Sequence, residues 1–158
     1  MFFIRLLLLF LNPSCLKKFN VMKYLNNPFN IRHSSGQSFV GEIDPADGFC
    51  RFSNVGYSVR AAILILKSYR RRKVVSISDI ISTWAPPSEN PTSSYVSFVC
   101  NELIVNRSTV IDISRPLLLY NFLRALCKFE TGYTLSYDDF DSVYISTVFG
   151  FTDDLFLE

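Results

Sequence analysis

The sequence predicts a mainly α-helical fold with at most a small β-hairpin early in the chain. After residue 53, apolar residues recur with the spacing of one helix face in several segments. Most of these segments start near a residue that can cap a helix, and several stop at proline or glycine. Alternation typical of strands is short and confined to SFVGEI and GFCRF, which flank the turn sequence DPADG and predict the hairpin.

The first helical pattern begins after Ser53, the expected N-cap. Its apolar face holds Val59, Ala62, Ile63, Leu66 and Tyr69. The cationic run YRRRK follows at the C-terminal end, where positive charge complements the helix dipole. This placement favours a solvated helix end over a nucleic-acid patch.

Two shorter helices are expected next. SISDIISTWA, capped by Ser76 or Ser78, turns Ile77, Ile80, Ile81 and Trp84 inward, and the prolines of PPSENPT end it. Thr92 is the expected cap of the following helix, whose core face is Tyr95, Val96, Val99 and Leu103. At its helical spacing Trp84 fits the core better than a sugar-stacking site.

The last two helices carry the clearest boundary signals. Ser114 precedes RPLLLYNFLRALCKFE, which has Pro116 in its first turn and Gly132 after its end. Ser136 begins the final segment, with an acidic residue three positions later as in a capping box. The later part of that segment, VYISTVF, is β-branched and aromatic, so a strand is an alternative there.

Length and composition indicate one globular domain over residues 22–158. The chain has 158 residues, of which 49% are hydrophobic and 19% charged, and this composition excludes disorder. No apolar run approaches the roughly 20 residues of a transmembrane helix, so no integral membrane span is expected. The net charge of +2 gives no general attraction to nucleic acid, which is not an expected partner.

Residues 1–21 are an N-terminal extension with two interpretations. MFFIRLLLLFLNPSC imitates a signal peptide, but its apolar run is short and a small-residue cleavage site is missing. Alternatively, Met22 is the true start of the protein. Both interpretations stay open, and with them the cellular location.

The sequence indicates neither a metal site nor a cofactor. Four cysteines, Cys15, Cys50, Cys100 and Cys127, lie far apart without a CxxC, and His33 is the only histidine. Buried free thiols are therefore favoured over disulfides or zinc ligands. His33 has no motif-marked nucleophile partner, and neither a GxGxxG nor a Walker loop is present, so no nucleotide cofactor is expected.

Four motifs together resemble a known family. NPFNIR at Asn27–Arg32, GFCRF at Gly48–Phe52, APPSENPTSSY at Ala85–Tyr95 and ETG at Glu130–Gly132 follow one another along the chain. This pattern resembles small phage-type lytic or structural virion proteins of the lysozyme superfamily, which includes lytic transglycosylase-like peptidoglycan hydrolases. The resemblance implies a lysozyme-like helical domain and a peptidoglycan glycan strand as its partner.

The resemblance also implies site residues. Glu130 matches the family's glutamate at a helix end and would be the catalytic general acid. A carboxyl that donates a proton near neutral pH needs a raised pKa, which apolar neighbours such as Phe129 promote. Asn27, Asn30, Arg32 and Tyr95 would bind substrate, although a purely structural role for the asparagines is an equal alternative.

A second carboxylate is not marked by any motif. Glu89, in the proline-rich loop, is the alternative acid, although it could equally cap the following helix. Other candidates are Glu42, Asp44, Asp47, Asp138, Asp139 and Asp141. Because hydrolysis normally uses two carboxylates, their lack of a pattern favours lytic transglycosylase over muramidase chemistry.

Two functions from different classes therefore remain. The first is a peptidoglycan-binding and peptidoglycan-cleaving protein of phage or prophage origin. The second is a catalytically inactive virion protein that keeps the fold and has other virion proteins as partners, an alternative favoured by Thr131 where Asn or Ser is more usual. Either would place the protein in a virion or at the bacterial cell envelope.

Overall fold

The computed structural model describes residues 25–88 and 90–150, and it is mainly helical with one small early hairpin, as predicted. The elements in chain order are β1 (Glu42–Ala46), β2 (Phe49–Phe52), α3 (Val55–Arg71), α4 (Ile77–Trp84), α5 (Thr92–Leu103), α6 (Pro116–Thr131) and α7 (Tyr137–Phe149). The expected extension 1–21, the alternative start at Met22, Cys15 and Glu89 lie outside the described residues.

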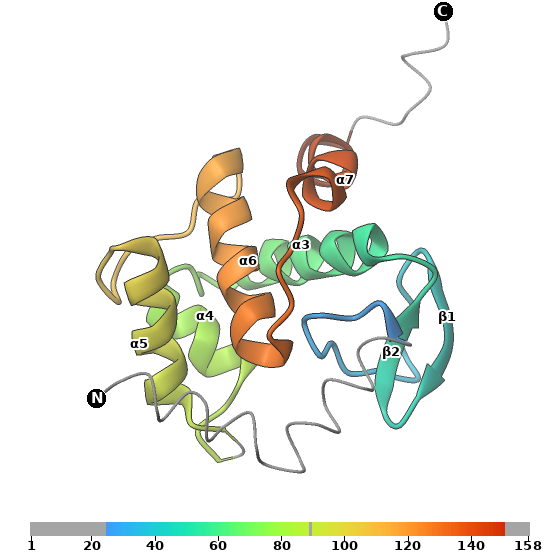
Figure 1. The fold of residues 1–158 in the computed structure, drawn as a ribbon, viewed down its shortest axis with the longest axis horizontal. Helices are drawn as coiled ribbons and strands as arrows, with labels where there is room; N and C mark the ends of the chain where they lie inside the picture. Colours follow the sequence, from blue (N-terminus) through green and yellow to red (C-terminus); the bar gives the residue numbers. More distant parts are fainter. Residues whose placement is uncertain (1–24, 89, 151–158) are drawn as a thin grey trace, which may run out of the picture.

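The helices surround a core to which α3 and α6 contribute most. Helix α7 packs on α3, and α5 packs on both α4 and α6. Figure 1 shows α4 and α5 on one side of α6, with the hairpin on the other. Fully buried side chains come from nearly every element, among them Phe52, Ile63, Ile81, Leu123 and Phe140. None of the described helices is both long and apolar enough to cross a membrane.

Polar contacts rather than periodicity decide where several helices start. Asn54, not the expected Ser53, caps α3, and its Oδ1 accepts the Tyr57 N–H at 3.2 Å. Thr92 is the first residue of α5 instead of its cap, because its hydroxyl donates to the Ala85 carbonyl. Ser114 hydrogen-bonds Asp112 and leaves the cap position of α6 to Arg115.

The final helix confirms the predicted N-cap, Ser136. The Ser136 hydroxyl accepts the Asp139 N–H at 3.1 Å, and α7 continues from there to Phe149. The strand alternative for VYISTVF is therefore wrong. Phe140 and Tyr144, one helical turn apart, are both buried, so tertiary packing outweighs the β-branched composition.

Strand β2 lies between two antiparallel neighbours. On one side it pairs with β1, where Glu42 is opposite Phe52. On the other side, Cys50 N–H donates to the Ile31 carbonyl at 2.9 Å and Arg32 forms a bridge with Phe49. The hairpin is thus anchored to the loop that precedes it, which brings residues 31–33 beside β2.

Gly41 allows the loop before β1 to pass close to α3, and replacing it tests this contact. Its φ is +77°, and an added Cβ would lie 2.1 Å from the Tyr57 ring. Gly48 has a similar φ of +81°, but nothing lies within 4 Å of its Cβ position. We expect Gly48→Ala to lower the free energy of unfolding by about 1–2 kcal/mol through backbone strain, and Gly41→Ala to lower it clearly further.

Urea unfolding of both variants measures the difference. Equal losses in the two variants would show that the Tyr57 contact yields without cost. The double variant Gly41→Ala with Tyr57→Ala, compared with Tyr57→Ala alone, should show only the strain contribution if the ring is the obstacle.

Candidate functional site

A groove opens where the loop before the hairpin meets the ends of α4 and α6. Its volume is about 570 Å³, within the range of small-ligand sites. Polar and aromatic side chains make up much of its lining, including Asn30, Arg32, Gln37, Phe39, Tyr69, Trp84, Asn90 and Glu130. Phe49 also lines the groove. All four motifs of the family resemblance therefore contribute residues to one concave surface.

The loop in front of this groove is held by the buried side chain of Asn27. Its Oδ1 accepts the Ile31 N–H at 3.1 Å, and its Nδ2 donates to the carbonyls of Ile31 and Cys50, both at 2.9 Å. Phe29 and Ile31 are buried in the core. Asn27, expected to bind substrate, is only 2% exposed and serves to build the loop.

Asn30 turns its side chain toward the end of α6. It adopts a left-handed backbone conformation with φ +51°, which asparagine tolerates better than most residues. Its Nδ2 donates to Glu130 Oε2 at 3.0 Å, although the two residues are 100 positions apart. The Thr131 hydroxyl adds a contact to the Pro28 carbonyl at 3.2 Å. The loop and the helix end are therefore joined at the groove.

Aromatic rings lie behind Glu130. The Tyr95 and Phe129 rings stack with centroids 3.9 Å apart, and Phe98 packs on Phe129 at 5.4 Å. Tyr95, expected to bind substrate, is only 1% exposed, and its hydroxyl is buried near the Glu130 carboxylate. Burial, together with the nearby Glu130 charge, raises the pKa of Tyr95 well above its usual value. Tyr95 therefore supports Glu130 from behind as a neutral side chain.

Arg32 and Trp84 flank the opening of the groove. The Arg32 guanidinium lies 5.6 Å from the centre of the Phe49 ring, and the Arg32 side chain is exposed. Trp84 is half-buried and meets Phe29 edge to face at 6.5 Å. It packs against the core, as expected from its spacing, and also presents part of its ring to the groove.

Glu130 is the only carboxylate among the described residues that line the groove. Asp138 and Asp139 lie at the start of α7, and Asp139 is bonded to the capping Ser136. The carboxylates of the hairpin do not line the groove either. Asn90, the neighbour of Glu89, does line it. The described part of the groove thus offers one acid with Asn30 beside it.

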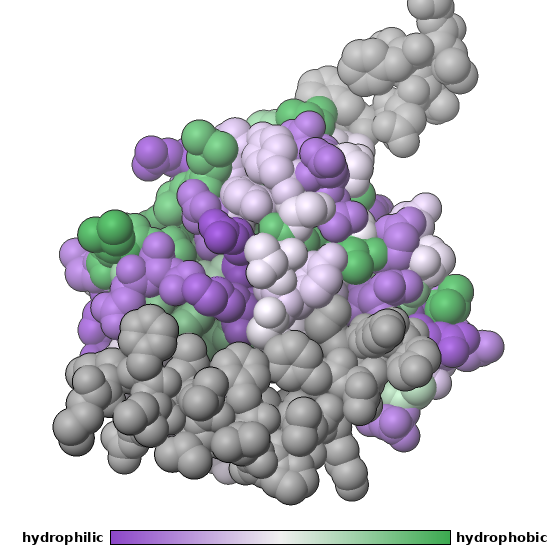
Figure 2. Space-filling view, in the orientation of Figure 1, coloured by the Kyte–Doolittle hydropathy of each residue, from purple (hydrophilic) through white to green (hydrophobic). Residues whose placement is uncertain are grey.

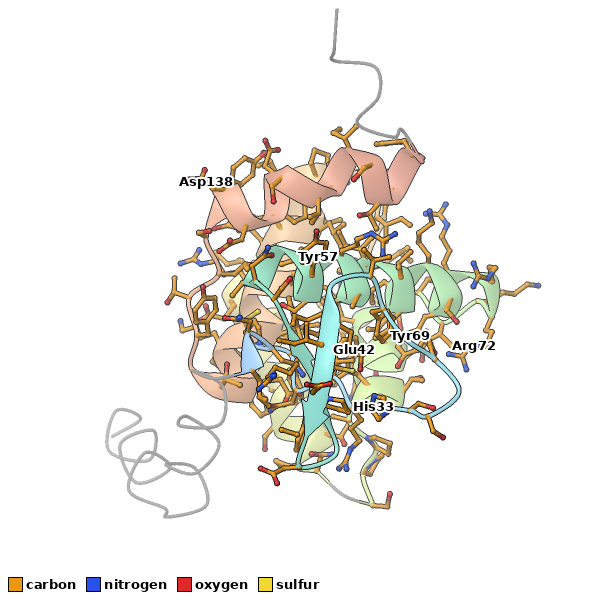
Figure 3. All side chains as sticks on the ribbon, turned by 90° about the vertical axis from the view of Figure 1, so that its right-hand side faces the viewer. His33, Glu42, Tyr57, Tyr69, Arg72 and Asp138 are labelled. Carbon is orange, nitrogen blue, oxygen red and sulfur yellow. The ribbon has the colours of Figure 1, made fainter. Side chains whose placement is uncertain are left out.

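A second polar cluster is formed by His33, Glu42 and Cys50, next to the segment that contributes Ser34, Gln37 and Phe39 to the groove. His33 Nδ1 is 2.8 Å from Glu42 Oε1, and Glu42 Oε2 accepts the Phe39 N–H at 2.9 Å. Figure 3 shows His33 and Glu42 together on the hairpin side of the molecule, below α3. The three residues share no sequence motif; the only signal would have been their register in paired strands.

Burial and charge set the protonation states in this cluster. Burial, with Glu42 nearby, raises the pKa of the Cys50 thiol to about 12. Burial works to raise the pKa of Glu42 as well, but hydrogen bonds from Phe39 N–H and His33 outweigh it, so the pKa of Glu42 is lowered. Near neutral pH the cluster therefore contains a thiol and a carboxylate.

Removing the Asn27 side chain should destabilise the fold through this loop. Asn27→Ala leaves the Ile31 N–H and two carbonyls without these partners in a buried environment, so we expect the free energy of unfolding to fall by about 2 kcal/mol or more. The exposed Asn121 on α6 provides the control, Asn121→Ala, which should change it by less than about 0.5 kcal/mol. Chemical denaturation measures both; similar values would contradict the anchoring role.

Comparison with known proteins relates the chain to a bacteriophage protein. No protein-family model matches it. It is similar to Protein P5 of Pseudoalteromonas phage PM2, with 37% identity over 94 residues, covering 55% of this chain and 58% of P5. The chain thus spans less than two thirds of that relative's length. The phage part of the sequence-based resemblance is supported, whereas the lysozyme-superfamily part stays a prediction.

Proposed function

We propose that the protein binds a peptidoglycan glycan strand in the groove and cleaves it as a lytic transglycosylase, with Glu130 as general acid. The proposal includes a lysozyme-like relationship for the helical fold. The observation that carries it is the convergence of Asn30 and Glu130, whose side chains meet at 3.0 Å in the groove. Both residues belong to motifs of the family that the sequence resembles.

The lining of the groove supports a sugar polymer as ligand. Glycan strands present hydroxyl and amide groups together with the apolar faces of their rings. Asn30, Arg32 and Asn90 supply hydrogen-bonding groups, and the partly exposed Trp84 and Tyr69 supply aromatic surface. Arg32 could also pair with a carboxylate of the stem peptide.

The single carboxylate that the described residues place in the groove supports transglycosylase chemistry. Glu130 would give its proton to the glycosidic oxygen as the bond to the anomeric carbon breaks. The same carboxylate would then take a proton from a hydroxyl of the sugar itself, whose oxygen closes onto the anomeric carbon to form an anhydro sugar. No water is consumed, so the second carboxylate of a hydrolase is not needed.

The second candidate is a virion structural or interaction protein that keeps this fold without catalysis. The specific observation favouring it is that Glu130 and Thr131 both fasten the loop, through Asn30 and the Pro28 carbonyl. Such contacts stabilise a scaffold whether or not a sugar binds. Its partners would be other virion proteins, in keeping with the similarity to a phage protein.

Mass spectrometry of fragments released from purified peptidoglycan distinguishes the two. The full chain is compared with Glu130→Gln, which keeps the shape but removes the transferable proton, and with Glu102→Gln as control. Glu102 is on α5 and pairs with Lys128 at 2.9 Å, outside the groove. We expect anhydro-muropeptides from the wild type and Glu102→Gln, and a loss of at least about 100-fold in Glu130→Gln.

Other products would contradict parts of the proposal. Fragments with reducing-end sugars would show a hydrolase that recruits a further acid. A folded wild-type protein that releases nothing would instead support the scaffold. Circular dichroism of each variant establishes that a loss of activity is not a loss of fold.

A further inference from the structure

We propose that His33, Glu42 and Cys50 form a binding site for a Zn²⁺ ion that fixes the loop along one wall of the groove. Their potential ligand atoms all lie within 4.8 Å of one another. The proposal does not depend on peptidoglycan cleavage. It also runs against the expectation from the sequence that no metal site is present.

Strand pairing explains how the three side chains meet. Cys50 and Phe52 are two residues apart in β2, so their side chains point to the same face, and Glu42 is opposite Phe52. On the other side of β2, Ile31 pairs with Cys50, and His33 is two residues further along. All three side chains therefore belong to one face, within reach of neighbouring and diagonal contacts.

The distances suit a tetrahedral ion after a small adjustment. Zinc bonds to nitrogen, oxygen and sulfur place ligand atoms about 3.3 to 3.8 Å apart. The His33–Glu42 contact of 2.8 Å has to open slightly, and the wider contacts of the cluster have to close. The His33 side chain is 33% exposed, which gives its ring freedom to move and gives an ion a path from solvent.

The ligand types favour zinc over calcium or magnesium. A thiolate and an imidazole are ligands of zinc and other late transition metals, whereas calcium and magnesium prefer sets of oxygen atoms. Three protein ligands leave a fourth position for water or for the Arg32 carbonyl, whose oxygen lies 3.4 Å from Cys50 Sγ. Metal uptake would exchange the thiol proton for the ion and release that proton to solvent.

The surroundings already orient the carboxylate. Phe39 N–H donates to Glu42 Oε2 at 2.9 Å, which leaves Oε1 directed at His33. Hydrogen bonds of this kind hold ligands in place around protein-bound metals. The Glu42 side chain is only 3% exposed, so the cluster is shielded from water on that side. The ligand positions are thus largely preformed.

The site would act on the groove through the chain between its ligands. Ser34, Gln37 and Phe39 all line the groove, and all three lie between His33 and Glu42 in the sequence. An ion that links His33 to Glu42 closes this segment into a loop and reduces its freedom to move away. We therefore assign the ion a structural role in shaping the groove.

Cobalt is the probe that reports the ligands directly. The metal-free, reduced full chain is titrated with Co²⁺, and absorption is recorded for the thiolate-to-cobalt band and the visible bands of tetrahedral cobalt. We expect one equivalent to bind and an equivalent of Zn²⁺ to bleach the spectrum. Atomic emission of the dialysed zinc complex should give one ion per chain.

Variants identify the ligands. Cys50→Ser should abolish the thiolate-to-cobalt band. His33→Gln should weaken cobalt binding by more than about tenfold, because losing even a residue that only orients a metal ligand costs about that much affinity. Cys100→Ser, with Cys15→Ser, is the matched control and should keep the full spectrum. Because Cys50 is buried and its variant could unfold, His33→Gln provides the independent test.

Two results would overturn the proposal. One is a folded wild-type protein that gives no tetrahedral cobalt spectrum. The other is a spectrum that survives in folded Cys50→Ser and His33→Gln but disappears when Cys15 or Cys100 is replaced. A rise in melting temperature with Zn²⁺ that is absent in His33→Gln would support the structural role.

Discussion

The buried side chain of Asn27 is the interaction on which both sites depend. Through one amide group it fixes the Ile31 backbone and the Cys50 carbonyl, so the loop and β2 keep a constant relation. This relation directs Asn30 to Glu130 on one side and places His33 near Cys50 on the other. An amide is suited to the position because it donates and accepts at once without a charge to bury.

Outside the groove, exposed apolar residues are scattered over the surface. Figure 2 shows hydrophobic residues reaching the surface at separate places, with hydrophilic ones between them. Ile104, at the αL end of α5, and Leu117 on α6 are examples of such exposed apolar residues. Scattered residues of this kind are normal on protein surfaces and do not by themselves indicate a partner.

Local patterns predicted the elements of this fold well, and contacts between distant segments were harder to foresee. Apolar spacing identified α3 and α6. The hairpin lies where it was predicted, but only Asp47 and Gly48 form its turn, and the residues Asp44–Ala46 of the expected turn belong to β1. The caps Ser53, Thr92 and Ser114 were wrong because neighbouring polar groups compete for the same hydrogen bonds. The burial of Tyr95 agrees with its place on the predicted core face of α5, and it was the substrate-binding role given to it that overlooked this. The meeting of His33 with Cys50 arises from strand register, which no short motif records.

The environment of Glu130 bears on the choice between enzyme and scaffold. A pure scaffold gains little from burying the Tyr95 hydroxyl beside the Glu130 carboxylate, whose charge helps raise the pKa of Tyr95. A scaffold also gains little from the Glu130 carboxylate, which faces the groove with the Tyr95 and Phe129 rings behind it. Polar groups placed in this way are typical of functional sites, where they are kept for a ligand rather than for stability. The loop contacts of Thr131 explain stability, but they do not explain why a carboxylate and an amide converge where the groove is open. A ligand bound in the groove, as proposed, would account for this convergence.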